Sequence, residues 1–146
     1  MGVLDQLEGS IVGLDTAPLI YFIERHPTFH AVVKPFFVAL TEEKFSIVTS
    51  TVTLVETLTH PLRLKKPDLA QRYQEILLNA ENLTTLAVSP ASAIKAAEIR
   101  ADYNLRTPDA IQLATAVIAN AAFFLTNDRT LQKFPDVQVI VLDDLR

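Results

Sequence analysis

The sequence predicts an α/β protein in which five strands form a mainly parallel sheet that is covered by helices on both faces. Short apolar runs alternate along the chain with segments of helical periodicity. Several of these runs are apolar throughout, which is typical of strands buried on both faces. With 146 residues, 49% of them hydrophobic and 21% charged, and with no internal repeat or long linker, the chain is expected to form one domain, residues 1–146.

The first segments alternate strands and helices. The apolar run Ser10–Leu14 predicts a strand. A helix is expected from about Pro18, because the fixed φ of proline suits a first helical turn. A second helix is predicted for Phe29–Leu40, and the run Phe45–Thr49, rich in β-branched residues, predicts the second strand.

The middle of the chain continues the alternation. A helix is expected over Thr51–Thr59 and is predicted to stop at Pro61, since proline lacks the N–H that a helix interior needs. The amphipathic spacing within Pro67–Asn79 predicts another helix. Leu83–Val88 is predicted to be the third strand, and Pro90–Tyr103 an Ala-rich helix.

The last elements are a helix and two strands. Thr107 is a candidate N-cap for a helix that runs to Asn120, with proline and an acid in its first turn. Phe123–Thr126 and Val137–Val141 are predicted to be the fourth and fifth strands. The helix of Pro90–Tyr103 must start and finish near one edge of the sheet, so we expect it to run crosswise and not antiparallel to its strand.

Two scarcities exclude whole classes of chemistry. The chain has 0 Cys, which excludes disulfides, thiolate metal sites and cysteine nucleophiles. Its 3 Gly are Gly2, Gly9 and Gly13, so no glycine-rich, phosphate-binding loop can follow the first strand. The net charge of -4 gives no general basic footprint for nucleic acid. An acidic N-terminal segment and the absence of a long apolar stretch predict a cytoplasmic protein with no membrane partner.

Four acids are predicted to gather at one edge of the sheet. Asp15 follows the first strand, Asp128 follows the fourth, and Glu56 lies in the helix after the second. Asp109 opens a helix that must begin at this edge, since only a short connection joins the end of that helix to the fourth strand. Ligands of parallel α/β sheets bind outside the carboxyl ends of the strands, so this edge is the expected functional site.

The four carboxylates would repel one another strongly unless a cation offset their charge. Ligation by oxygen alone suits Mg²⁺ or Mn²⁺, and such an ion would allow a chain without a glycine-rich loop to handle phosphate. Each acid also has an ordinary structural explanation. Asp15 and Glu56 could cap helices, Asp109 could favour a helix dipole, and Asp128 could form an Asx turn.

Four segments resemble the PIN domain family, in particular its VapC-type toxin ribonucleases. The resemblance lies in Val12–Tyr21, Ser50–Glu56, Thr107–Ala116 and Phe124–Asp128, which occur in the family's order within a core of about residues 10–142. It implies a three-layer α/β/α sandwich and an endoribonuclease that depends on Mg²⁺ or Mn²⁺. It assigns the metal-binding and catalytic roles to Asp15, Glu56, Asp109 and Asp128. It assigns polar support to the hydroxyls of Thr126 and Thr16. Ala17 departs from the family pattern, in which many members carry a hydroxyl.

We therefore expect metal-assisted hydrolysis of an RNA phosphodiester. Asp15 and Asp109 are the expected direct metal ligands, and Asp128 would bind a second ion or bind through water. Glu56 would be a ligand or would position the water. Asn127 is compatible with a supporting hydrogen bond, although it is also a common turn residue.

Five basic residues are candidate RNA contacts, with solvated surface charge as the alternative explanation. They are Arg63, Lys65, Lys66, Arg106 and Arg129. The resemblance also implies a cognate antitoxin that covers the site and a homodimer formed through helices of the first half. The apolar segments Leu19–Ile23, Val32–Val33 and Phe36–Phe37 could supply that interface, although core packing would equally explain them.

Other functions are disfavoured by particular residues. A phosphoacceptor domain needs an Asp at the end of the third strand, where this chain has Val88-Ser89-Pro90. A haloacid-dehalogenase-type phosphatase needs a second acid at the position of Ala17. Pro27 lies between His26 and His30 and makes a shared zinc site improbable. A catalytically silent PIN domain that binds RNA or protein is the alternative to the enzyme.

Overall fold

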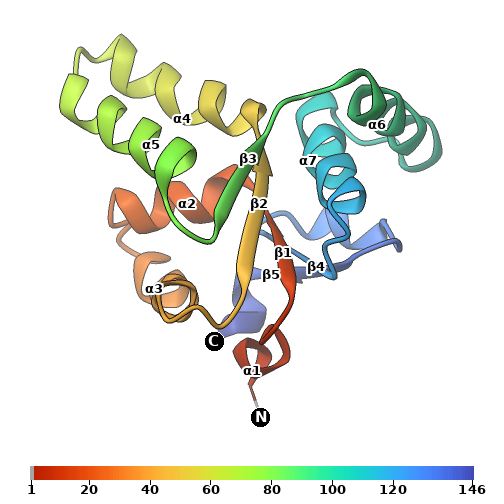
Figure 1. The fold of residues 1–146 in the computed structure, drawn as a ribbon, viewed down its shortest axis with the longest axis horizontal. Helices are drawn as coiled ribbons and strands as arrows, with labels where there is room; N and C mark the ends of the chain where they lie inside the picture. The colour runs from red at the N-terminus through yellow and green to blue at the C-terminus, as the bar shows by residue number, and fades with distance from the viewer. Residues whose placement is uncertain (1) are drawn as a thin grey trace.

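The five strands form one sheet in the order β3-β2-β1-β4-β5 in a computed structural model, which describes residues 2–146 (Figure 1). All four neighbouring pairs are parallel, which confirms the expected sheet. The strands are β1 (Ile11–Leu14), β2 (Ser46–Ser50), β3 (Leu83–Leu86), β4 (Phe123–Thr126) and β5 (Gln138–Val141). The first strand of the chain therefore lies at the centre of the sheet.

Helices cover both faces of the sheet, so the three-layer α/β/α sandwich is confirmed (Figure 1). On one side lie α2 (Thr16–Ile23), α3 (His30–Thr41), α4 (Thr51–Arg63) and α5 (Pro67–Asn79). On the other side lie α6 (Pro90–Tyr103) and α7 (Thr107–Ile118). Figure 1 shows α6 beyond the end of the sheet and next to α7. The helix does not return along β3, which agrees with the expectation that it would not run antiparallel to its strand.

Two apolar cores lie on opposite faces of the sheet, because successive side chains of a strand point to alternate faces. Val12, Leu14 and Leu125 belong to the core beneath α2, α3 and α5. Phe124 belongs to the core beneath α6 and α7. Gly13 allows α7 to lie directly on β1, since a Cβ placed there would be 2.7 Å from both Ala116 Cβ and Phe124 Cδ1. This close packing brings the helix that carries the third acid onto the central strand.

The predicted end of helix α4 is wrong, because α4 continues through Pro61 to Arg63. The Pro61 ring is buried in the last turn, where its missing N–H removes only one helical hydrogen bond. Helical bonding resumes beyond it, with Leu64 N donating to His60 O at 3.0 Å. The helix ends at Arg63 with Leu64 as its C-cap, and the positive φ of 56° at Lys65 turns the chain away from the helix axis.

Other boundaries also differ from the sequence prediction. The helix expected from Pro18 begins at Thr16, because Asp15 caps it. Strand β3 ends at Leu86, two residues earlier than expected. Three short helical segments were not predicted: α1 (Val3–Gln6) and the 3-10 turns η1 (Arg129–Lys133) and η2 (Leu142–Leu145). No helix within residues 2–146 is long and apolar enough to cross a membrane.

Most of the apolar residues considered for a dimer interface lie in the core instead. Leu19, Ile23, Val33, Phe36 and Phe37 are all buried. They pack between α2, α3 and the sheet, with Phe22 and Phe37 rings stacked at a centroid distance of 4.5 Å. A dimer interface through these particular side chains is therefore wrong for the folded chain.

Candidate active site

All four predicted acids line one pocket of about 420 Å³ at the carboxyl edge of the sheet. Each comes from a different element. Asp15 caps α2, Glu56 lies within α4, Asp109 lies in the first turn of α7, and Asp128 caps η1. The remaining lining residues are Thr16, Ala17, Ile20, Tyr21, Arg106, Thr126 and Asn127. The topology argument thus located the acids correctly, because parallel strands end at one edge.

Both carboxylate oxygens of Asp15 accept hydrogen bonds. Its Oδ1 accepts a hydrogen bond from Thr16 N at 2.9 Å, and its Oδ2 accepts one from Thr126 Oγ1 at 2.7 Å. Burial raises the pKa of Asp15 to about 6 from 3.8, despite these two bonds, and the negative charges of Asp109 and Glu56 contribute to the rise. Burial therefore disfavours the charged form of Asp15 more than its two hydrogen bonds favour it.

Glu56 is linked to Asp15 through Thr16, which donates hydrogen bonds to both carboxylates. Thr16 Oγ1 donates to Glu56 Oε1 at 2.7 Å, while Thr16 N serves Asp15. Ser50 is the residue that caps α4, by accepting from Val52 N at 3.2 Å, so the alternative explanation of Glu56 as part of a capping box is wrong. Its carboxylate is held toward the pocket by a side chain of another helix.

Asp109 is 7% exposed and forms an ion pair with Arg106, whose Nε lies 3.1 Å from Asp109 Oδ2. The N-cap of α7 is Arg106, with no side-chain capping bond, so the prediction of Thr107 as the N-cap is wrong. The bond to Asp109 raises the pKa of the Arg106 guanidinium, and Asp128 and Glu56 act in the same direction. Arg106 is thus the cation toward which the acids of the pocket converge.

Asp128 combines a local and a pocket role. Its Oδ1 accepts from Thr130 N at 2.9 Å and from Thr130 Oγ1 at 2.7 Å, which is the capping turn foreseen as the ordinary explanation. Its backbone N donates to Thr126 Oγ1 at 3.0 Å, so Thr126 joins Asp128 to Asp15. Asn127 Nδ2 donates to Tyr21 Oη at 3.1 Å and fixes the tyrosine at the pocket wall.

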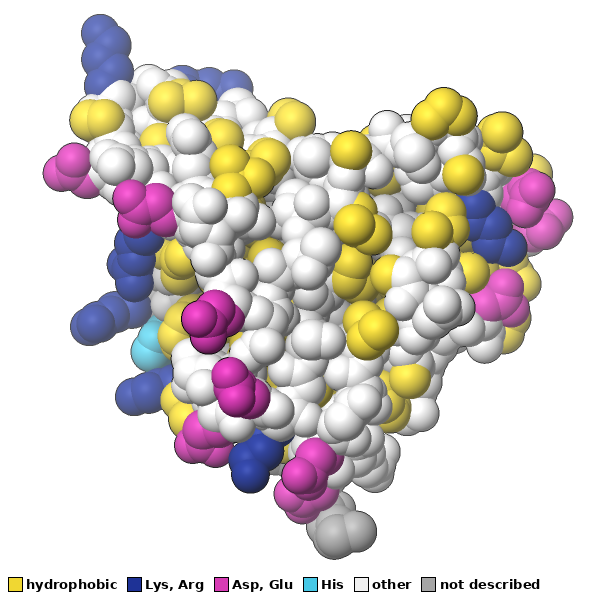
Figure 2. All heavy atoms as spheres, viewed as in Figure 1, with side chains coloured by type: hydrophobic (Ala, Val, Ile, Leu, Met, Phe, Trp, Pro, Cys, Tyr) yellow, Lys and Arg dark blue, Asp and Glu magenta, His cyan; other side chains and the backbone are white. Residues whose placement is uncertain are grey.

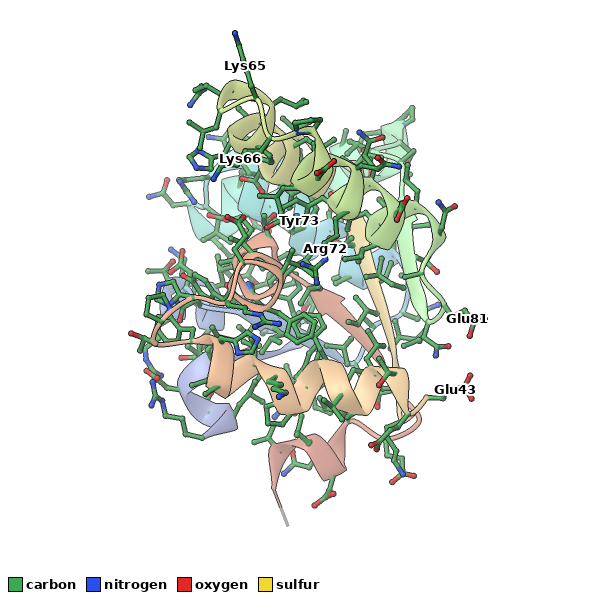
Figure 3. All side chains as sticks on the ribbon, turned by 90° about the vertical axis from the view of Figure 1, so that its left-hand side faces the viewer. Glu43, Lys65, Lys66, Arg72, Tyr73 and Glu81 are labelled. Atoms are coloured by element: carbon green, nitrogen blue, oxygen red, sulfur yellow. The ribbon has the colours of Figure 1, made fainter. Side chains whose placement is uncertain are left out.

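The five basic candidates separate into two groups. Arg106 lines the pocket, whereas the other four do not. Arg129 lies 3.7 Å from Asp143 of η2. Arg63 ends α4, and Lys65 and Lys66 occupy the turn before α5, where Figure 3 shows Lys65 pointing outward. A direct contact with a phosphate in the pocket is therefore open to Arg106, and the others would have to contact a longer strand.

The donor set suits a divalent cation by kind and by charge. The pocket offers carboxylate and hydroxyl oxygens, which Mg²⁺ and Mn²⁺ prefer, and four acids face one arginine there. Among residues 2–146, however, no three acidic or histidine side chains converge into a ready metal cage. Protein donors engage all four acids instead: Arg106 holds Asp109, and Thr130 holds Asp128. Thr126 and the backbone of Thr16 hold Asp15, and the Thr16 hydroxyl holds Glu56.

Sequence reasoning missed a buried polar layer beneath the pocket. Gln112 of α7 is 2% exposed and lies among side-chain oxygens from the end of β2 and the start of α4. A single glutamine between apolar neighbours of a helix gives no sequence signal that it is buried. Tyr21 was also missed, although it lies two turns after Asp15 in the same helix.

A PIN domain family model matches residues 12–137, and the chain belongs to this family. Its structural neighbours are VapC toxins. The VapBC2 complex of Rickettsia felis, bound to promoter DNA, has a TM-score of 0.69 and 20% identity over 90% of this chain and 98% of that one. A toxin-antitoxin complex from Klebsiella pneumoniae has a TM-score of 0.68 and 21% identity, covering 92% and 98%.

Mycobacterium tuberculosis VapC20, a toxin that cleaves the sarcin-ricin loop, has a TM-score of 0.69 and 18% identity, covering 88% of this chain and 99% of that one. At these identities the likeness concerns the fold. A comparison with curated protein sequences found no match.

Proposed function

We propose that the chain is a metal-dependent endoribonuclease that hydrolyses RNA phosphodiester bonds. The observation that carries the proposal is the convergence of four carboxylates and one arginine in a single pocket of a PIN fold. The neighbour VapC20 is described as cleaving an RNA loop, which supports the same substrate class. The lining of the pocket, with four acids and one arginine, supports a divalent cation as its cofactor.

Asp15, Asp109 and Asp128 would hold Mg²⁺ or Mn²⁺, and Glu56 would act as a further ligand or water acceptor. A bound ion would lower the pKa of a water and stabilise the leaving oxygen. The Thr126 hydroxyl bonds to the Asp15 carboxylate and to the backbone N of Asp128 and so fixes their relative positions. Thr16 bonds to Asp15 and Glu56 and fixes these two carboxylates in the same way. Arg106 would bind the phosphate, because its exposed guanidinium can exchange from Asp109 to another anion.

The decisive experiment incubates a mixed RNA pool with the purified protein and Mn²⁺ and maps the ends of the products. The wild type should cleave, EDTA should stop the cleavage, and Asp109→Asn should reduce it to background. Asp143→Asn, which removes an exposed acid outside the pocket, is the matched control. Full activity of Asp15→Asn would overturn the assignment of the site. A wild type that neither binds Mn²⁺ nor cleaves would support the silent, RNA-binding or protein-binding alternative.

We also propose that a cognate antitoxin binds the chain, as the toxin-antitoxin complexes among the structural neighbours suggest. An apolar groove of about 270 Å³ between α2, α3 and α5 would offer it the partly exposed side chains of Phe22 and Ile76, with the buried Leu19 and Phe37 also in the lining. Figure 3 looks onto α3 and α5, with Glu81 near one end of α5 and Lys66 at the other. Co-purification with the protein encoded next to this chain, and its loss in Ile76→Lys, tests this partner.

A homodimer is the remaining proposed assembly. Since most of the apolar side chains considered for the interface in α2 and α3 are buried, the proposed surface lies on other helices. Val55 and Leu62 are 66% and 58% exposed and lie on one face of α4, and Ile94 of α6 is 63% exposed. Figure 2 shows hydrophobic side chains over both of these helical regions. Sedimentation analysis should give a dimer that Val55→Lys converts to a monomer, and a monomeric wild type would contradict the proposal.

A further inference from the structure

Beneath the pocket, five buried polar side chains from four elements bond to one another. Thr49 and Ser50 end β2, Thr53 belongs to α4, Thr16 begins α2, and Gln112 comes from α7. All five are less than 9% exposed, and every buried side-chain polar atom among the described residues has a hydrogen-bond partner. A fully satisfied buried network of this kind fixes the arrangement of its members.

The hydrogen bonds of this network have a direction. Ser50 Oγ donates to Gln112 Oε1 at 2.8 Å, and this fixes the amide so that its Nε2 faces the threonines. Gln112 Nε2 donates to Thr53 Oγ1 at 2.7 Å and lies 3.5 Å from Thr16 Oγ1. Gln112 thus presents its N–H groups to both threonine hydroxyls.

The threonine hydroxyl hydrogens then have only one consistent arrangement. Thr49 Oγ1 donates to Leu14 O at 2.9 Å, so the 2.8 Å contact between Thr49 and Thr53 uses the hydrogen of Thr53. The oxygen of Thr53 already accepts from Gln112. The Thr16 hydroxyl is left to donate its hydrogen to Glu56, at 2.7 Å.

We propose that Gln112, whose amide is held by Ser50 and Thr53, is a positioning residue of the nuclease site: its Nε2 faces Thr16 Oγ1 and so directs the Thr16 hydroxyl to hold the Glu56 carboxylate toward the pocket. Gln112 does not line the pocket, whereas Asp109, one helical turn earlier on α7, does. Glu56 itself is exposed on α4 and would otherwise be free to turn toward solvent. One helix thereby supplies one acid directly and orients another. This inference rests on the proposed function.

The test compares Gln112→Met with Thr115→Val. The first removes both amide bonds at similar volume, and the second removes a buried hydroxyl of α7 that bonds only to Ile111 O. Per folded protein, Gln112→Met should lower kcat by about 10- to 100-fold, the usual effect of losing a group that orients a metal ligand. KM for RNA should change little, and Thr115→Val should keep the wild-type kcat. Equal activity of the two variants would overturn the proposal.

Two further arms separate positioning from folding. Thr53→Val should resemble Gln112→Met, and Thr53→Ser, which keeps the hydroxyl, should restore kcat, so the proposal stays testable if Gln112→Met folds poorly. In a Glu56→Gln background, Gln112→Met should cause no further loss, because it acts through Glu56. Additive losses would contradict that route.

A wild type without nuclease activity would count against the proposed function and not against the network. In that case crystal structures of Gln112→Met and Thr53→Val decide the inference. Loss of the contact between Thr16 Oγ1 and Glu56 Oε1 supports it, and an unchanged contact in both variants overturns it.

Discussion

Arg106 and Asp109 form an ion pair within one helical turn, and its two partners differ greatly in exposure. The Arg106 side chain is 79% exposed, whereas that of Asp109 is 10% exposed. The exposed guanidinium can therefore exchange between the carboxylate and a phosphate at little cost, since exposed ion pairs contribute little to stability. The buried carboxylate is confined to the pocket.

Arg106→Gln should weaken binding of single-stranded RNA in EDTA. Losing one phosphate contact should reduce the slope of log affinity against log salt by about 0.7. Arg129→Gln is the matched control, since Arg129 lies near Asp143 and outside the pocket. Fluorescence anisotropy across a salt series measures both slopes. The same slope change in both variants would remove Arg106 from its assigned role.

In the metal-free protein, the stability of Asp15→Asn relative to the wild type should rise with pH. The pKa of Asp15 is raised from 3.8 to about 6 by burial, so the folded state retains a proton that the unfolded state releases. That stabilisation is complete below about pH 4 and is lost as pH rises through 6. Between these limits the variant should gain about 1–3 kcal/mol over the wild type.

Urea denaturation in EDTA at several pH values measures this gain as the difference in free energy of unfolding. Asp143→Asn, which removes an exposed carboxylate outside the pocket, serves as the control. A difference between Asp15→Asn and the wild type that does not change with pH would contradict the prediction.

Thr126→Val should damage both the site and the fold. The Thr126 hydroxyl is fully buried, donates to Asp15 Oδ2 and accepts from Asp128 N. Its removal leaves buried polar groups unpaired, which costs about 1–3 kcal/mol. Thr126→Ser retains the hydroxyl and should keep most of the stability and cleavage. Thermal melts and RNA cleavage check the pair, and equal behaviour of the two variants would show that the methyl group matters more.

Gly13→Ala should destabilise the protein by forcing α7 away from β1. The added Cβ would meet Ala116 Cβ and Phe124 Cδ1 at 2.7 Å, and overpacking of a core typically costs about 1–3 kcal/mol. Gly2→Ala, where a Cβ meets no atom within 4 Å, should leave the stability unchanged. Chemical denaturation compares them, and an unaffected Gly13→Ala would mean that α7 shifts without cost.

The sequence predicted those features that depend on local pattern. Apolar runs located the strands, and the short connection before Phe123 placed the start of α7, and hence Asp109, at the carboxyl edge. The positions of the acids follow from where strands end, which is why the pocket was foreseen. The resemblance added the family, which the match over residues 12–137 confirms.

Features that depend on tertiary packing were not predictable in this way. The helix passes Pro61 because the proline ring is buried, and burial cannot be inferred from one residue. Arg129 was expected near the pocket because it follows Asp128, yet it lies beside Asp143 of a turn that the pattern did not predict. Gln112 bonds to Ser50 and Thr53, which lie about 60 residues away in sequence, so the pattern of neighbouring residues gives no sign of these contacts.

The order of the strands also determines when the pocket can exist. Asp15 lies at the end of the central strand, and its partner Thr126 comes 111 residues later, on the strand that completes the other side of β1. A ribosome must therefore synthesise and release the chain beyond β4 before these groups can meet. Until then the nascent chain carries the acids separately, so the pocket cannot form during the synthesis of most of the chain.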